Sequence, residues 1–177
     1  MTTTTLIPQN VHSLADYIEL TFKKYADRPA YNALGQSKTF AEMDELSAKF
    51  ANYLLTQTSL VPGDRIAIQL PNLIQHPIAV YGALRAGMVV VNTNPLYTPS
   101  EMKHQFNDSG TKALVILADF VPKYEQIKDE VGIQDVIITS APQLLNLLKV
   151  DNSEYKCYAH IFESITATEV PARPAIQ

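Results

Sequence analysis

Two stretches in the first third of the chain repeat apolar residues at the spacing of an α-helix. In residues 39–57, Thr39 and Glu42 stand at the spacing of a capping box, in which each side chain binds the other residue's backbone N–H. The apolar stripe that follows predicts an amphipathic helix and consists of Phe40, Met43, Leu46, Phe50 and Leu54. A shorter helix is predicted over residues 13–27, with one apolar side made of Leu14, Tyr17, Ile18 and Phe22. Between the two helices, a weak alternation around "GQ" predicts a small hairpin.

From residue 61 onward, short apolar runs alternate with helical patterns. Runs of strand length without a polar side cover residues 65–70, 88–94, 111–119 and 134–140. Helical patterns follow them over residues 72–87, 98–110, 120–132 and 141–151. Pro77 leaves two readings of the first of these helices, which either begins near His76 or kinks there. Strands without a polar face, each followed by a helix, indicate a parallel sheet covered on both sides, with right-handed crossovers.

The predicted fold class is therefore α/β. We expect an open, mainly parallel sheet of about four core strands with helices on both faces, plus the N-terminal helices and the hairpin. The predicted boundaries are a flexible N-terminus over residues 1–12, one α/β unit over 13–150, and a weakly patterned tail or linker over 151–177.

Composition and charge argue against some classes of protein. The chain has 177 residues and a net charge of −4, without the basic face that nucleic-acid binding requires. Its single cysteine cannot form an internal disulfide, which fits the reducing cytoplasm. The most apolar stretch, residues 73–91, is interrupted by polar residues and by proline, so it is a poor membrane span.

No motif in the chain predicts a catalytic, cofactor-binding or metal-binding residue. The six glycines form neither a G-x-G-x-x-G nor a G-x-x-x-x-G-K-[ST] arrangement, so no loop of either kind is available to bind phosphate. The four histidines are far apart and lack the spacing of metal ligands. Of the four, His76 beside Pro77 could orient the start of a helix or line a cleft.

The segment "NTNPLYTPSE" contains polar residues that local structure does not fully explain. Thr98, Pro99 and Glu101 match the start of a helix. Asn92, Asn94 and Tyr97 remain, and they follow a strand at its carboxyl end, where open α/β sheets usually bind ligands.

The stretch "PNLIQHPIAVYGALRAGMVVVNTNPLYTPSEMKHQFNDSGTKALVI" resembles the N-terminal part of the AMP-forming acyl-CoA synthetases, an adenylate-forming superfamily. The similarity is greatest to bacterial long-chain fatty acid–CoA ligases and covers about residues 11–140. In that family a carboxylate attacks the α-phosphate of Mg-ATP, which gives acyl-AMP and pyrophosphate. The thiol of CoA then displaces AMP.

The resemblance implies that ATP, Mg²⁺ and CoA belong to a longer parent enzyme. The family's Ser/Thr/Gly-rich loop ending in lysine, its acidic metal ligand, its ribose-binding aspartate and its C-terminal lysine have no counterpart in this chain. We therefore expect an N-terminal fragment that is inactive alone, whose partners are the remainder of the parent enzyme and its fatty acid substrate. Asn92, Asn94, Tyr97 and His76 are its candidate cleft or subdomain-interface residues.

Two alternatives stay open at this point. The chain could belong to an aryl-acid (coumarate-type) CoA ligase, or it could be a non-catalytic α/β module that binds an acyl ligand or self-associates. A homodimer and a peripheral association of the parent with the inner face of the membrane are open in the same way.

Overall fold

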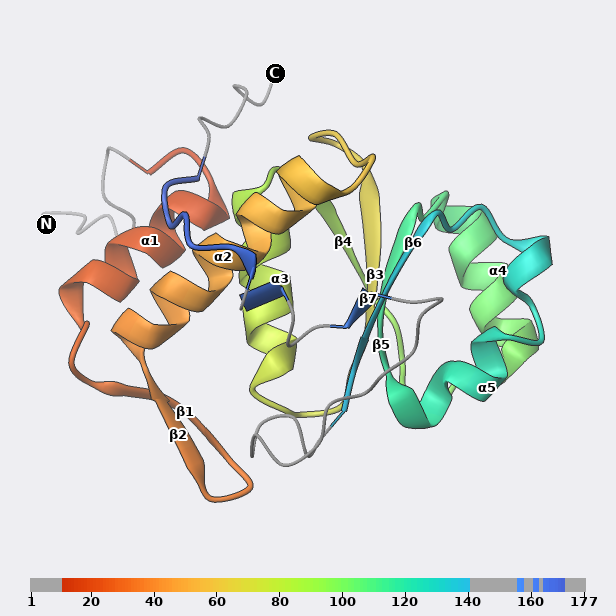
Figure 1. Ribbon diagram of the computed structural model, residues 1–177, viewed down its shortest axis with the longest axis horizontal. Coiled ribbons are helices and arrows are strands. Elements are labelled where there is room, and N and C mark those ends of the chain that lie inside the picture. Colours follow the sequence, from red (N-terminus) through yellow and green to blue (C-terminus); the bar gives the residue numbers. More distant parts are fainter. Residues whose placement is uncertain (1–10, 141–155, 158–160, 163, 171–177) are drawn as a thin grey trace, which may run out of the picture.

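The protein is described by a computed structural model that covers residues 11–140, 156–157, 161–162 and 164–170 (Figure 1). The helices are α1 (Leu14–Lys24), α2 (Phe40–Gln57), α3 (Gln75–Arg85), α4 (Pro99–Ser109) and the single turn α5 (Val121–Tyr124). Short 3₁₀ turns occur at Ala118–Phe120 and Lys128–Glu130. The strands are β1 (Pro29–Ala33), β2 (Gln36–Thr39), β3 (Arg65–Gln69), β4 (Val89–Asn92), β5 (Ala113–Leu117), β6 (Asp135–Thr139) and β7 (Lys156–Cys157).

The main sheet has the strand order β4-β3-β5-β6-β7, and all of its pairs are parallel. The four predicted strands are therefore confirmed, and the short strand β7 extends the sheet beyond β6. Ile66 pairs with Val90 on one side and with Ala113 on the other. The order of the strands thus reverses at β3, because the chain passes first to one side of it and later to the other.

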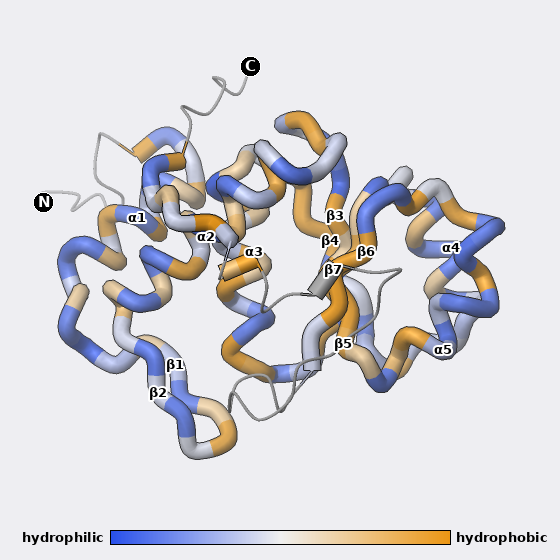
Figure 2. Tube along the Cα trace, viewed as in Figure 1, coloured by the Kyte–Doolittle hydropathy of each residue, from blue (hydrophilic) through white to orange (hydrophobic). Residues whose placement is uncertain are grey.

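Helices cover both faces of the sheet, as predicted. In Figure 1, α1, α2 and α3 lie on one side of it and α4 and α5 on the other. The residues of β5 alternate between two apolar clusters: Val115 and Leu117 pack on the α1–α3 side, whereas Leu114 and Ile116 pack on the α4–α5 side. A strand buried on both faces has no polar side, which explains the continuous apolar runs in the sequence (Figure 2).

The strongest local prediction concerned α2, and the structure confirms it. Thr39 accepts a hydrogen bond from the backbone N–H of Glu42 (3.2 Å), and the Glu42 carboxylate accepts one from the backbone N–H of Thr39 (2.8 Å). The same reciprocal arrangement joins Thr98 and Glu101 at the start of α4. Both helices therefore begin where the sequence places them.

The start of α3 settles the question that Pro77 raised. The helix begins at Gln75, so Pro77 lies in its first turn, where the missing N–H has no helical partner to lose. The Gln75 side chain donates from Nε2 to the hydroxyl of Thr139 (3.3 Å) and to the backbone oxygen of Ser140 (3.1 Å). These bonds attach the first turn of α3 to the carboxyl end of β6.

Two local expectations were wrong. The apolar side of α1 is centred on Ala15, Ile18 and Phe22, while Leu14 and Tyr17 remain 62% and 45% exposed. The predicted hairpin is confirmed, and it turns at Leu34 and Gly35, which both have positive φ.

The continuous helix predicted over residues 120–132 is replaced by α5 and separate 3₁₀ turns. The reason is a change of hydrogen bonding after Glu125. From there the N–H of Ile127 bonds to the carbonyl of Tyr124, and that of Glu130 bonds to the carbonyl of Ile127, at the three-residue spacing of a 3₁₀ turn.

The expected helix over residues 141–151 lies outside the described residues. Beyond β7, Ile161 is buried in the cluster on the α1–α3 side, and the carbonyl of Ala167 accepts a hydrogen bond from Asn52 Nδ2 of α2 (2.9 Å). The helices that the structure describes include none with the length and apolar character of a membrane span.

Candidate functional site

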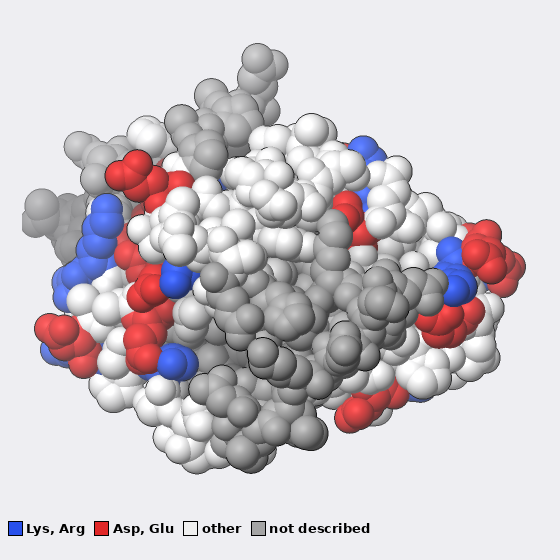
Figure 3. Space-filling view, in the orientation of Figure 1, with Lys and Arg blue, Asp and Glu red and all other residues white. Residues whose placement is uncertain are grey.

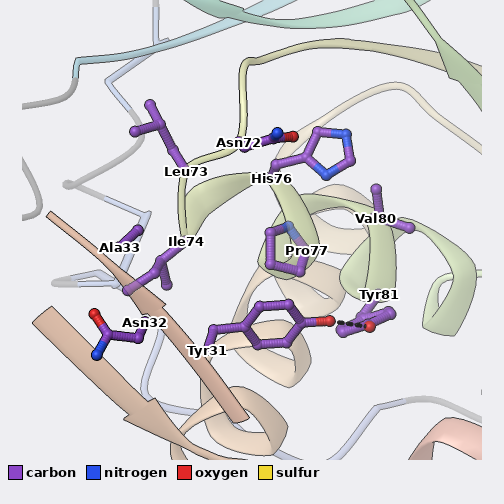
Figure 4. A pocket seen from close by; sticks show the side chains of 10 residues that line it. All are labelled: Tyr31, Asn32, Ala33, Asn72, Leu73, Ile74, His76, Pro77, Val80 and Tyr81. Atoms are coloured by element: carbon purple, nitrogen blue, oxygen red, sulfur yellow. Dashed lines mark hydrogen bonds between the residues drawn. The ribbon is translucent and has the colours of Figure 1, made fainter.

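A cavity of about 420 Å³ lies between the β1–β2 hairpin and α3 (Figure 4). Its walls come from β1, from the loop after β3 and from the first two turns of α3. The lining residues are Tyr31, Asn32, Ala33, Asn72, Leu73, Ile74, His76, Pro77, Val80 and Tyr81. The loop that follows β3 starts at the strand where the sheet order reverses, which is the usual ligand position in open α/β sheets.

A pair of tyrosines fixes the hairpin against α3. The hydroxyl groups of Tyr31 and Tyr81 share a hydrogen bond, drawn as a dashed line in Figure 4. The ring of Tyr81 also packs edge-on against Phe22 of α1, with centroids 5.5 Å apart. Tyr81 therefore joins β1 to α3 through its hydroxyl and packs on α1 through its ring, so contacts with both helices hold this wall of the cavity in place.

Among the residues that the structure describes, those that line the cavity include no Asp, Glu, Lys or Arg. Burial lowers the pKa of His76, so its imidazole is neutral at neutral pH. Burial, and next the hydrogen bond with Tyr31, raise the pKa of Tyr81, so its hydroxyl also stays neutral. At neutral pH these lining residues consequently carry no charge.

The other three candidates lie at the carboxyl end of β4: Asn92 is its last residue, and Asn94 and Tyr97 belong to the loop that follows. A set of hydrogen bonds holds this segment in place. The backbone oxygen of Asn94 accepts from Gln69 Nε2 (3.2 Å) and from the N–H of Tyr97 (3.1 Å). Asn94 Oδ1 accepts from the N–H of Leu96 (3.0 Å). The backbone oxygen of Asn92 accepts from Gln105 Nε2 (3.1 Å). Donors from the sheet and from α4 thus fix the backbone of this loop.

The structure does not bring the four predicted residues together. His76 lines the cavity beside α3, whereas Tyr97 lines a separate hollow along α4 with Glu101 and His104. Asn92 and Asn94 are exposed and act mainly through backbone groups. The helices α3 and α4 cover opposite faces of the sheet (Figure 1). The cavity at α3 and the hollow along α4 therefore lie on opposite sides of the sheet.

Sequence reasoning missed Tyr31 and Tyr81. Tyr81 follows Pro77 by four residues, which places both on one face of α3, and this spacing was a usable signal. Tyr31 comes from a strand fifty residues earlier, and no local pattern in the sequence relates it to α3.

The described residues include no group of side chains that fits a metal ion. Nowhere among them do three His, Cys, Asp or Glu side chains gather closely enough to hold a metal ion. On the face shown in Figure 3, Lys and Arg are interspersed with Asp and Glu at both ends of the molecule. We therefore assign no metal ligand to these residues.

Comparisons with known proteins agree with the resemblance found in the sequence. A family model described as AMP-binding enzyme matches residues 18–173. A long-chain-fatty-acid–CoA ligase of Escherichia coli is 44% identical over 146 residues, which are 82% of this chain and 26% of the relative. The chain thus spans about a quarter of the length of this curated relative.

Solved structures show the same fold. The crystal structure of an anthranilate CoA ligase in complex with anthranoyl-AMP matches 91% of this chain and 29% of its own, with a TM-score of 0.80 and 15% identity. A long-chain-fatty-acid-CoA ligase from Archaeoglobus fulgidus matches 89% of this chain and 30% of its own, with a TM-score of 0.73 and 20% identity. At these identities the likeness concerns the fold alone. Because the family match spans nearly the whole chain and the sheet has the architecture of these enzymes, the protein belongs to the AMP-binding enzyme family.

Proposed function

We propose that this chain forms the N-terminal part of a long-chain fatty acid–CoA ligase. The observation that carries the proposal is the 44% identity to the ligase of E. coli over 146 residues. The whole enzyme would join a fatty acid, ATP and CoA to give acyl-CoA, AMP and pyrophosphate. In the first step a carboxylate oxygen attacks the α-phosphorus of ATP and pyrophosphate leaves. In the second step the CoA sulfur attacks the acyl carbon and AMP leaves.

In this proposal the chain supports the site rather than performing the chemistry. Its sequence has neither glycine motif for binding phosphate, and its described residues do not group as metal ligands. Mg-ATP would be held by the remaining part of the enzyme, which is the partner of this chain. The chain would contact the substrates or the rest of the enzyme at two separate places, through His76 beside the hairpin and through Asn92, Asn94 and Tyr97 at the end of β4. Accordingly, we propose that the chain alone forms no acyl-adenylate.

A chimera tests the function. The matched part of the E. coli ligase is replaced by the corresponding residues of this chain, and palmitate-dependent exchange of labelled pyrophosphate into ATP is measured together with palmitoyl-CoA formation. We expect activity from the chimera and none from this chain alone or from the E. coli enzyme lacking the matched part. A folded but inactive chimera would contradict the proposal, as would exchange catalysed by this chain alone.

The same chimera separates long-chain from aryl acids. The identity to curated long-chain ligases favours palmitate, whereas the anthranilate ligase supports only the fold at 15% identity. We expect a higher kcat/KM with palmitate than with coumarate, and the reverse order would favour the aryl-acid alternative. The cytoplasmic location, homodimer and peripheral membrane association of the whole enzyme stay predictions, and sedimentation of the chimera with and without vesicles tests the last two.

A further inference from the structure

The helix α1 lies at one end of the molecule, and its outer face carries apolar side chains (Figure 1). Leu14, Tyr17 and Leu20 follow each other at three-residue spacing along this outer face and are 62%, 45% and 38% exposed. We propose that the outer face of α1 binds the same face of a second copy of the chain, with the two helices side by side and antiparallel. The inference goes beyond the proposed function and does not rest on it, because the residues that carry it all belong to α1.

The opposite side of α1 already packs on the protein. Ala15, Ile18 and Phe22 are buried there, and the Phe22 ring lies 5.5 Å from that of Tyr81 in α3, centroid to centroid. Successive residues of a helix are rotated by about 100°, so Leu20 projects away from this packed side. The apolar surface of the outer face therefore stays in water in a single chain, and contact with another apolar surface removes it from water.

The charges along α1 identify a second copy as the occupant. Asp16 lies in the first turn, whereas Lys23 and Lys24 lie in the last turn. Two antiparallel helices place the acidic first turn of each beside the basic last turn of the other. Glu19, the other acid of α1, is bound to Arg85 of α3 (3.1 Å) and is directed away from the outer face. The outer face is thus complementary to itself under a two-fold rotation, which is the symmetry of most homodimers.

The same pairing sets the register and the strength of the contact. Asp16 lies beside Lys23 of the second copy when the two-fold axis passes between residues 19 and 20, and Leu20 then faces its own counterpart. A helix of 11 residues is about 16 Å long, so the contact is smaller than the ~1,200–2,000 Å² of a stable interface. We therefore expect a weak dimer with a dissociation constant on the order of 0.1 mM.

Sedimentation equilibrium of this chain measures the association. With that dissociation constant, the chain is mainly monomeric at about 10 µM and mainly dimeric at about 1 mM. Leu20→Glu should weaken the association at least tenfold, because it places two carboxylates at the two-fold axis. Leu96→Glu, the same change at a leucine that is 77% exposed in the loop after β4, should leave it unchanged. Tyr17→Glu gives an independent variant if Leu20→Glu fails to fold.

A charge exchange tests the antiparallel pairing. Lys23→Glu alone should weaken the association, because it places two acids together, and the double variant Asp16→Lys, Lys23→Glu should restore it. A chain that stays monomeric up to about 1 mM, where the expected affinity makes most of it dimeric, would overturn the proposal. Unchanged association of a folded Leu20→Glu variant would overturn it as well.

Disulfide crosslinking tests the register. In a Cys157→Ser background, Leu20→Cys lies at the two-fold axis and should give a covalent dimer in the presence of oxidised glutathione. Leu14→Cys lies about 16 Å from its counterpart along the two helices, which is too far for a disulfide, and should stay reduced. More efficient crosslinking through Leu14→Cys than through Leu20→Cys would contradict the antiparallel arrangement.

Other occupants of the outer face give different results. The remainder of a longer enzyme would leave this chain monomeric, and Leu20→Glu would then impair the chimera. A lipid surface would make the chain sediment with vesicles of phosphatidylethanolamine and phosphatidylglycerol, again without self-association and only while Leu20 is present. Either result would overturn the proposal. An inactive chimera whose parent chain still associates through α1 would refute the proposed function and leave this inference standing.

Discussion

Arg85 and Asp44 form an ion pair in which Nη1 of the arginine lies 2.8 Å from Oδ1 of the aspartate. Only 8% of the Arg85 side chain is exposed. Its Nε donates to Glu19 (3.1 Å), and its Nη1 donates to the hydroxyl of Ser47 (2.9 Å). One guanidinium of α3 thus binds polar groups of α1 and α2. The helices α1 and α2 are therefore held to α3 by polar contacts as well as by apolar packing.

Replacing Arg85 by methionine should lower the free energy of unfolding by about 2 kcal/mol. That is less than the ~3–5 kcal/mol for breaking a fully buried pair, because Asp44 and Glu19 are 31% and 26% exposed and keep part of their hydration. Urea unfolding measures the change. Lys103→Met, which removes the exposed pair with Glu130, is the control and should cost less than about 1 kcal/mol. Equal decreases in the free energy of unfolding of the two variants would show that the Arg85 contacts stabilise the fold no more than an exposed ion pair does.

Gly82 allows α2 and α3 to approach closely. A Cβ at this position would lie 2.8 Å from Cδ1 of Phe50 and 2.9 Å from the backbone oxygen of Ser47. Gly82→Ala gains about 1 kcal/mol of helix propensity but loses more through overpacking, which costs ~1–3 kcal/mol. We expect a net loss of about 1 kcal/mol and a fall in Tm of about 2–4 °C by calorimetry. Gly132→Ala, where a Cβ meets nothing within 4 Å, is the control, and a stabilised Gly82→Ala would refute the close approach.

His76 should make stability depend on pH. Burial lowers its pKa in the folded chain, so the unfolded chain takes up a proton first as the pH falls. Stability is then greatest above the ordinary histidine pKa of about 6.5 and decreases as the pH falls from there through the lower folded pKa. Urea unfolding at several values between pH 7.5 and pH 5 measures this slope, and NMR of the imidazole gives the pKa directly. His76→Gln should reduce the slope, and an unchanged slope would assign it to other groups.

The sequence predicted those parts of the fold that depend on local chemistry. Thr39 and Glu42 define the start of α2 by their spacing alone, and the continuous apolar run of β5 follows from burial on both of its faces. The same reasoning failed for residues 120–132, because apolar residues three apart suit a 3₁₀ turn as well as a helix. Tyr124 and Ile127 are both buried with this spacing.

The candidate site was harder to predict because its walls meet only in the folded chain. His76 was selected by its position beside Pro77, and the structure places it in the cavity. The pairing of Tyr31 with Tyr81 depends on how the hairpin folds back onto α3, and no periodicity within either element encodes that. Asn92, Asn94 and Tyr97 were chosen from their place at the carboxyl end of a strand, and that place is confirmed while their role is still a prediction.

Asn94 gives the sharpest test of the loop after β4. Its Oδ1 accepts a hydrogen bond from the N–H of Leu96, and its backbone oxygen accepts from Gln69 Nε2 and from the N–H of Tyr97. Asn94→Ala therefore removes only the side-chain hydrogen bond. Leu96 is 77% exposed, so its N–H can bind water instead, and the loss of stability should stay near 1 kcal/mol. In the chimera we expect a higher KM with kcat within about threefold of the parent chimera, because a positioning loop affects binding before chemistry. Asn94→Asp keeps the acceptor oxygen and should restore KM. A loss of kcat alone, with unchanged folding and no rescue by Asn94→Asp, would instead place Asn94 among the groups that act on the reacting atoms.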